Sequence, residues 1–152
     1  MIRKATMADV QAIYALLHHF ADKGLLLGRS YSSLYDQLRD FQVVMSEDGR
    51  RLIGCGALHI SWDNLAEIRS LAVVEEEQGK GVGGRLVESF LAEARSFEIS
   101  KVFTLTYQPR FFSRLGFEPI DKGQLPHKVW SDCVHCPKFP DCNEEAMIWQ
   151  AK

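Results

Sequence analysis

The 152-residue sequence lacks the features of a membrane or nucleic-acid-binding protein. No apolar run approaches the roughly 20 residues that a membrane-spanning helix needs. The formal net charge is only −2, so there is no general basic surface for nucleic acid. The first residues, "MIRKATMADV", lack the apolar segment of a signal peptide. We therefore expect a cytoplasmic protein that binds neither membrane nor nucleic acid.

Proline is scarce, with five residues, and the sequence has no repeat, low-complexity segment or linker. Nearly half of the residues (46%) are hydrophobic and 25% are charged, which is an ordinary balance for a globular protein. A chain of this length can bury one sizeable core. We therefore expect a single domain over residues 1–152.

Cysteine is also scarce, and three of the four cysteines gather in "CVHCPKFPDC", within a predicted loop at residues 127–143. A C-x-x-C pair is half of a zinc site, and the remaining ligands would come from nearby histidines or a distant cysteine. In a reducing compartment free thiols are the alternative, with a disulfide forming on oxidation. We favour free thiols and no metal. The residues concerned are Cys133, Cys136 and Cys142, with His127, His135 and Cys55 as possible further ligands.

The first third of the chain predicts a strand, two helices and a hairpin. Residues 1–5 suit a strand, and Thr6 with Asp9 form a capping box for a helix that ends at Gly24. Residues 30–41 have helical periodicity, with Leu34, Leu38 and Phe41 on the inner face. The next segment, "FQVVMSEDGRRLIGCGALHI", predicts a hairpin that turns at Asp-Gly.

The remainder completes a mixed sheet. A turn near Asp63 leads into the strand "LAEIRSLAVV", so three successive strands should be antiparallel. A helix after residue 81, a strand at 101–107, a short helix in "PRFFSRLGF" and a last strand in "EEAMIWQ" follow. The order β-α-α-β-β-β-α-β-α-β indicates an α/β protein with a mixed sheet rather than a regular βαβ repeat or a barrel.

Four glycines lie within six residues where a helix begins, in "EEEQGKGVGGRLVESF". Glycine disfavours a helix by about 1 kcal/mol relative to alanine, so their presence needs a reason. A helix N-terminus presents unpaired N–H groups and favours anions, and glycines let a phosphate approach the backbone. This pattern predicts a pyrophosphate site. Its members are Gln78, Gly79, Lys80, Gly81, Val82, Gly83, Gly84 and Arg85.

The glycine spacing fits two kinds of ligand. Gly79, Gly81 and Gly84 satisfy the dinucleotide pattern G-x-G-x-x-G, but that pattern follows the first strand of a parallel βαβ unit directly. Here residues 75–78 intervene, and the preceding strands are predicted to be antiparallel. The alternative spacing, Gln78-x-x-Gly81-x-Gly83 directly after "LAVV", resembles the acetyl-CoA-binding loop of the GNAT-type N-acetyltransferases, and "FFSRLGF" resembles a later motif of that family. The resemblance implies the GNAT fold, with pantetheine along Leu71, Ala72 and Val73.

Further stretches are similar to the acetyltransferase domain of bacterial N-acetylglutamate synthase. They are "IRKATMADVQAI", "GLLLGRS", "CGAL", "AEIRSLAV", "SKVFTLT", "FFSRLGFEPID" and "LPHK", in family order over most of residues 2–128. The short stand-alone form matches best in length. The resemblance implies acetyl transfer from acetyl-CoA to the α-amino group of L-glutamate, a step of arginine biosynthesis, and a homodimer would suit the fold.

Two residues are candidates for proton transfer. Glu67 lies on the strand that borders the thioester, where several GNAT enzymes carry a glutamate base; the alternative is a structural ion pair with Arg69. Many family members use a tyrosine as the acid in the late motif, but Phe112 stands there. Tyr107 is the substitute candidate, and a packing role is its alternative. A CoA thiol is acidic enough to leave unassisted.

A glutamate site needs arginine, which binds carboxylates with two parallel hydrogen bonds. Arg29, in "GRS", matches an arginine of the synthase motif, and Ser30 beside it either contacts substrate or caps the second helix. Arg69 shares side-chain parity with Glu67 and so is expected to face the site. His59 follows "CGAL" and is either a substrate contact or a surface residue.

Two other readings remain open at this point. The first is an acetyltransferase for another small amine or amino acid. The second is a non-catalytic module that binds acetyl-CoA, which the missing motif tyrosine alone favours. A nicotinamide oxidoreductase is a more distant third possibility.

Overall fold

The computed structural model describes residues 1–126 and 144–152, so the predicted cysteine loop at 127–143 lies outside the described residues. Seven strands form one sheet in the order β1-β2-β3-β4-β5-β7-β6. They are β1 (Ile2–Lys4), β2 (Phe41–Met45), β3 (Leu52–Trp62), β4 (Leu65–Val73), β5 (Lys101–Thr106), β6 (Glu118–Pro119) and β7 (Glu145–Gln150). All neighbours are antiparallel except β4 and β5. The mixed α/β sheet predicted from the sequence is confirmed.

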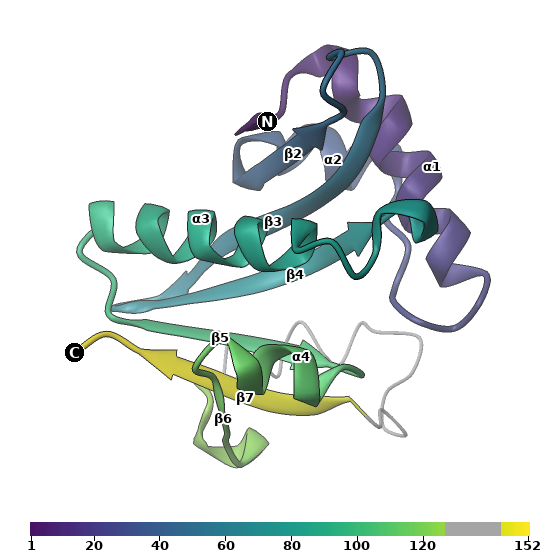
Figure 1. Ribbon diagram of the computed structural model, residues 1–152. Coiled ribbons are helices and arrows are strands. Elements are labelled where there is room, and N and C mark those ends of the chain that lie inside the picture. The colour runs from purple at the N-terminus through teal and green to yellow at the C-terminus, as the bar shows by residue number, and fades with distance from the viewer. Residues whose placement is uncertain (127–143) are drawn as a thin grey trace.

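The helices cover both faces of the sheet (Figure 1). Helix α1 (Val10–Ala21) packs on β3 and β4 from one side, with α2 (Tyr31–Asp36) beside it. Helix α3 (Val82–Ser96) packs on the same strands from the other side, and α4 (Pro109–Arg114) lies against β6 and β7. The predicted stripe of α3 is buried as a whole: Val82, Leu86, Val87, Phe90, Leu91 and Ala94. That stripe fixes where the N-terminus of α3 meets the end of β4.

The predicted ends of the first helix and the two predicted hairpin turns are present, with one change at the start of that helix. The predicted capping box forms, with the Thr6 N–H donating to Asp9 Oδ2 at 2.7 Å, but it caps a 3-10 turn (Met7–Asp9) that leads into α1. Helix α1 runs to Ala21, and Gly24 closes it as predicted: its φ is 73°, and the Leu25 N–H donates to the Phe20 carbonyl at 3.1 Å. The two predicted hairpin turns are present, with φ of 73° at Gly49 and 53° at Asn64.

The helix predicted over residues 30–41 is wrong in its second half. Helix α2 ends at Asp36, and a 3-10 turn (Leu38–Asp40) then leads directly into β2. Phe41 is therefore the first strand residue; it is fully buried because the strand, not a helix, carries it inward. Strand β6 was not predicted from the sequence; its two residues pair with Ile148 and Met147 of β7.

Strands β4 and β5 separate after a short contact. Their parallel register covers Leu65–Glu67 against Lys101–Phe103, and Figure 1 shows the two strands spreading apart beyond it. Across the opening, the Thr104 hydroxyl donates to the Ile68 carbonyl at 2.9 Å, and Thr104 is buried. The splay leaves a wedge in the middle of the sheet, and the candidate site lies there.

None of the helices in the described ranges, 1–126 and 144–152, combines the length and the apolar composition that crossing a bilayer requires.

Candidate active site

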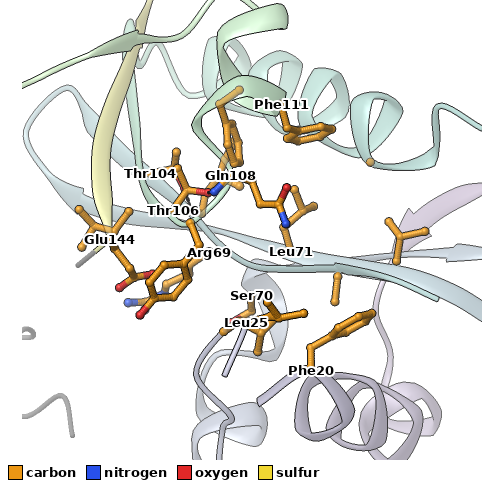
Figure 2. A pocket seen from close by; sticks show the side chains of 18 of the residues that line it. Phe20, Leu25, Arg69, Ser70, Leu71, Thr104, Thr106, Gln108, Phe111 and Glu144 are labelled. Carbon is orange, nitrogen blue, oxygen red and sulfur yellow. Dashed lines mark hydrogen bonds between the residues drawn. The ribbon is translucent and has the colours of Figure 1, made fainter. Parts of the chain in front are cut away.

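The wedge between β4 and β5 opens into a cleft with a volume of about 1490 Å³. Figure 2 shows Phe111 on one side of it, Phe20 and Leu25 on the other, and Leu71 between them. A cleft of this size exceeds the usual range for one small ligand, roughly 300–1,000 Å³. It has room for an extended cofactor and a small acceptor together.

A bulge in β4 shapes the floor of the cleft. Cys55 pairs with Ala72 and Ala57 with Arg69, so two residues of β4, Ser70 and Leu71, oppose Gly56 of β3. Ser70 has a φ of 57°, a left-handed conformation that is uncommon outside glycine. Such bulges re-aim side chains and are common beside active sites.

Gly56 makes the bulge possible. A Cβ at this position would meet Phe90 Cε2 at 2.9 Å and Leu71 Cδ1 at 3.0 Å. The absence of a side chain lets Leu71 lie over the backbone of β3, while β4 presents its far edge to the wedge. The residues expected along pantetheine, Leu71, Ala72 and Val73, all line the cleft.

The glycine loop closes the cleft at the end of β4, next to Val73. Gly79 and Gly81 have φ of 80° and 85°, conformations that L side chains rarely adopt, and Gly81 is the N-cap of α3. Gly83 lies under Phe111, whose Cζ would be 3.1 Å from an added Cβ. The Gln78 side-chain amide donates to the Val73 carbonyl at 2.9 Å, which ties the loop to the end of β4.

Backbone conformation and close packing therefore explain several of these glycines, and a helix N-terminus of this kind favours anions. Gln78, Gly79, Gly81, Val82, Gly83 and Gly84 line the cleft. The two charged members of the predicted set do not. Lys80 forms an ion pair with Glu77 at 3.2 Å, and Arg85, in the first turn of α3, is not among the residues lining the cleft.

The segment before the loop is fastened to α1. Glu75 Oε1 accepts from Lys23 Nζ at 2.8 Å and contacts His19 Nε2 at 2.5 Å. These contacts, first with Lys23 and then with His19, lower the pKa of Glu75 to about 2. A carboxylate that stays ionised keeps this turn attached over the physiological pH range.

The polar end of the cleft contains Glu67 and Arg69, and their side chains are 13% and 17% exposed. Glu67 Oε1 lies 3.5 Å from Arg69 Nη1, so the ion pair considered from the sequence is present in a loose form. Both residues line the cleft, and in Figure 2 Arg69 lies on the side of the pocket where Glu144 is labelled, away from Phe111. Glu67 thus combines contact with the cleft and restricted exposure to water.

Arg29 reaches the bulge from the segment between α1 and α2. Its Nε donates to Ser70 Oγ at 2.8 Å, and its Nη1 donates to Ser33 Oγ at 3.0 Å and Gln37 Oε1 at 2.7 Å. Arg69 Nη2 donates to the same Gln37 oxygen at 3.0 Å. The two predicted arginines are therefore brought together in one hydrogen-bonded group, and both line the cleft.

The other predicted residues have mixed placements. Ser30 lines the cleft but also caps α2, because its hydroxyl accepts from the Ser33 N–H at 3.1 Å. His59 Nδ1 contacts Asp40 Oδ2 at 2.7 Å, and His59 is not among the residues lining the cleft. Tyr107 follows β5 and lines the cleft.

Phe112, at the position expected for a tyrosine, is a core residue. It is 4% exposed and packs edge-on against Phe111 and Phe117, with ring centroids 5.0 and 5.1 Å apart. Cys55 is fully buried, and burial raises the pKa of its thiol to about 12. Among the described residues, no cluster of three or more potential metal ligands exists.

Sequence reasoning missed Gln37, Ser33 and Ser70. Each is an ordinary polar residue in an expected helix or strand, and only the tertiary structure brings them to Arg29. The left-handed backbone conformation of Ser70 could not be predicted either, because glycine, not serine, is the residue that usually indicates a positive φ.

Comparison with known proteins now identifies the class. The model of the acetyltransferase (GNAT) family matches residues 10–117, and the chain belongs to that family. It is 40% identical over 147 residues to an uncharacterized N-acetyltransferase of Chlorobaculum tepidum, covering 97% of this chain and 94% of that protein. It is 35% identical over 133 residues to the amino-acid acetyltransferase of Mycobacterium tuberculosis, covering 87% and 76%.

Solved structures agree with this. A Mycobacterium tuberculosis protein in complex with CoA superposes with a TM-score of 0.86 at 30% identity, covering 100% of this chain and 99% of that one. N-acetylglutamate synthase from Neisseria gonorrhoeae, complexed with CoA and N-acetyl-glutamate, gives a TM-score of 0.89 at 27% identity; this chain matches 35% of its length. The protein is a GNAT acetyltransferase that uses acetyl-CoA as its cosubstrate.

Proposed function

We propose that this acetyltransferase transfers the acetyl group of acetyl-CoA to the α-amino group of L-glutamate. The observation that carries the proposal is the meeting of Arg29 and Arg69 beside Glu67 at the polar end of the cleft. Two guanidinium groups match the two carboxylates of glutamate. The likeness to a synthase solved with N-acetyl-glutamate supports the same acceptor.

In the proposed reaction the amine nitrogen attacks the thioester carbonyl carbon. The α-ammonium must first lose a proton, and with an ordinary α-amino pKa of about 8 a nearby carboxylate suffices. Glu67 is the proposed base, acting directly or through a water molecule. Its contact with Arg69, at 3.5 Å, keeps the carboxylate at the polar end of the cleft.

The carbonyl oxygen becomes negatively charged as the new C–N bond forms. Backbone N–H groups of β4 beyond the bulge, at Val73 or a neighbour, are the proposed donors to this oxyanion. From Ile68 onward, the described strands pair with β4 on the β3 side alone, which leaves the wedge edge of β4 for the cofactor. The tetrahedral intermediate then collapses, the C–S bond breaks, and CoA leaves as a thiolate that takes up a proton.

Tyr107 is the proposed donor of that proton. It lines the cleft at the end of β5, and the position expected for a tyrosine in α4 has Phe112, which has no proton to give. Since thiols are far more acidic than alcohols, we expect the general acid to contribute less to the rate than the general base. A homodimer in the cytoplasm, acting in arginine biosynthesis, is part of the same proposal.

The test is release of CoA thiol from acetyl-CoA in the presence of each of the twenty amino acids in turn. The proposal expects turnover with L-glutamate well above the others. Faster turnover with a different amine would replace the acceptor and keep the chemistry. Binding of acetyl-CoA without thiol release for any of them would favour another class of acceptor or a binding module.

A further inference from the structure

A histidine of α1 contacts the backbone of one of the two site arginines. His18 Nε2 lies 3.1 Å from the carbonyl oxygen of Arg29. Since a carbonyl oxygen can only accept a hydrogen bond, Nε2 carries a proton and donates it. Arg29 lines the cleft and His18 does not, so the histidine supports the site from behind and has no direct part in the chemistry.

Two tyrosines hold the imidazole ring in place. Tyr14, one helical turn before His18, stacks on the imidazole with ring centroids 4.0 Å apart and ring planes inclined by 25°. Tyr31, the first residue of α2, stacks on Tyr14 at 4.1 Å with planes inclined by 7°. The three rings thus join α1 to α2 across the segment that carries Arg29, and His18 cannot turn away without breaking this stack.

The residue before Arg29 fits closely against the same ring. A Cβ at Gly28 would lie 2.9 Å from His18 Cε1 and 3.0 Å from His18 Nε2, too close without displacement of one of them. Gly28 does not have a positive φ, so its backbone conformation does not require glycine. The imidazole, which occupies the space beside the backbone, is therefore the structural reason for glycine at this position.

The backbone of Arg29 in turn determines where its guanidinium lies. Arg29 Nε donates to Ser70 Oγ at the bulge of β4, at 2.8 Å, and Nη1 donates to Gln37 Oε1 at 2.7 Å. An arginine side chain has many rotamers, so a shift of its backbone changes which partners the guanidinium reaches. A group that binds substrate must be held to within about 0.5 Å of its working position.

We infer that His18 is a positioning residue for the acceptor: its hydrogen bond to the Arg29 carbonyl and its packing on Gly28 place the Arg29 guanidinium where an acceptor carboxylate binds. Its effect should fall on the acceptor and not on acetyl-CoA, because the glycine loop has its own attachment to β4, from the Gln78 amide to the Val73 carbonyl. The inference rests on the proposed acetylation of L-glutamate.

The test measures kcat and the KM values for L-glutamate and acetyl-CoA in two replacements of His18. His18→Phe keeps an aromatic ring for the stack but has no donor. We expect it to raise the KM for L-glutamate about three- to tenfold, the effect of one neutral hydrogen bond, with kcat and the KM for acetyl-CoA close to wild type. A purely structural role would instead lower the amount of active protein, and so kcat, and leave both KM values unchanged.

His18→Gln is the conservative replacement. Glutamine loses the ring but keeps an N–H donor at nearly the same distance from the backbone as Nε2. It should therefore have a KM for L-glutamate closer to wild type than His18→Phe, and equal losses in both would contradict a role for the donor. Gly28→Ala disturbs the same contact from the other side and should raise the KM for L-glutamate without changing that for acetyl-CoA.

Combination with Arg29→Ala shows whether His18 acts through Arg29. In a protein that already lacks the guanidinium, His18→Phe should have no further effect on the KM for L-glutamate, because the effects of residues that act as one unit do not add. If wild type does not acetylate L-glutamate, the proposed function fails and the inference fails with it. If wild type acetylates L-glutamate but the two effects add, or His18→Phe leaves the KM unchanged, the inference alone is overturned.

Discussion

The Thr104 hydroxyl of β5 donates a 2.9 Å hydrogen bond to the Ile68 carbonyl of β4, across the point where the two strands separate. The bond is fully within the protein and joins strands that no longer pair through their backbones. It therefore limits how far the wedge opens, just below the cleft that we propose for the cofactor.

Replacing Thr104 by valine tests this relationship. Valine has nearly the same shape but lacks the hydroxyl, and it leaves the Ile68 carbonyl without this donor. We expect the free energy of unfolding to fall by about 1–2 kcal/mol. The KM for acetyl-CoA should rise as well, because the wedge loses its spacing. Thr106→Val cannot serve as a neutral control, because Thr106 Oγ1 accepts a hydrogen bond from the Gln108 N–H. Unchanged stability and an unchanged KM for acetyl-CoA in Thr104→Val would contradict the account.

Gly84→Ala separates folding from cofactor binding in the glycine loop. A Cβ at Gly84 would lie 3.7 Å from Leu115 Cδ2, an ordinary contact, and the residue is helical. Alanine should thus leave stability unchanged or raise it by up to about 1 kcal/mol. If Gly84 borders the pyrophosphate, the added methyl group should nevertheless weaken acetyl-CoA binding severalfold, as measured by calorimetry.

Gly81→Ala is the matched comparison. Gly81 has a φ of 85° and open space around an added Cβ, so the substitution introduces backbone strain without a clash. The left-handed conformation costs a non-glycine residue about 1–2 kcal/mol. Loss of stability in Gly81→Ala but not in Gly84→Ala is the expected pattern, and equal losses in both would mean that strain is not the reason for these glycines.

Glu67→Gln tests the proposed base. The amide has the same size but cannot accept the proton, so kcat should fall about 100-fold or more. The KM for acetyl-CoA should change little. Glu88→Gln, on the exposed side of α3, serves as the control. A kcat within a factor of two of wild type would show that the proton leaves by another route and that Glu67 only pairs with Arg69.

Asp9 should make stability depend on pH. Its side-chain hydrogen bonds from Arg3, followed by the Thr6 N–H, lower the pKa of the Asp9 carboxyl below 3.8. A carboxyl whose pKa is lower in the folded state stabilises the fold above the unfolded pKa and loses that contribution as pH falls through the folded pKa. Asp9→Asn should therefore destabilise by about 1 kcal/mol at pH 7. The difference should shrink below pH of about 4 in chemical denaturation, and a difference that is constant over this range would contradict it.

Features set by neighbouring residues could be predicted from the sequence. The apolar stripe of α3, the Asp48-Gly49 turn and the capping box of Thr6 all have local causes, and each is present. The positions of the pantetheine segment and the glycine loop followed from the family resemblance, and both line the cleft.

Features set by distant contacts could not be predicted. The helix pattern of residues 30–41 continues through Phe41, but pairing with β3 turns Phe41 into a strand residue. Gln37 thereby leaves the helix, with a φ of −112°, and its side chain meets Arg29 and Arg69. The position of Gln37 beside the two arginines thus depends on where β2 begins, and no local sequence pattern specified that point.

The central claim is that Arg29 anchors a glutamate carboxylate. The most direct measurement is the KM for L-glutamate in Arg29→Ala beside Arg50→Ala, a matched change in the exposed hairpin turn. The account predicts a rise of at least tenfold for Arg29→Ala alone, with the KM for acetyl-CoA unchanged, since one charged hydrogen bond is worth about 1.5–3 kcal/mol. Equal KM values for L-glutamate in both variants would contradict it.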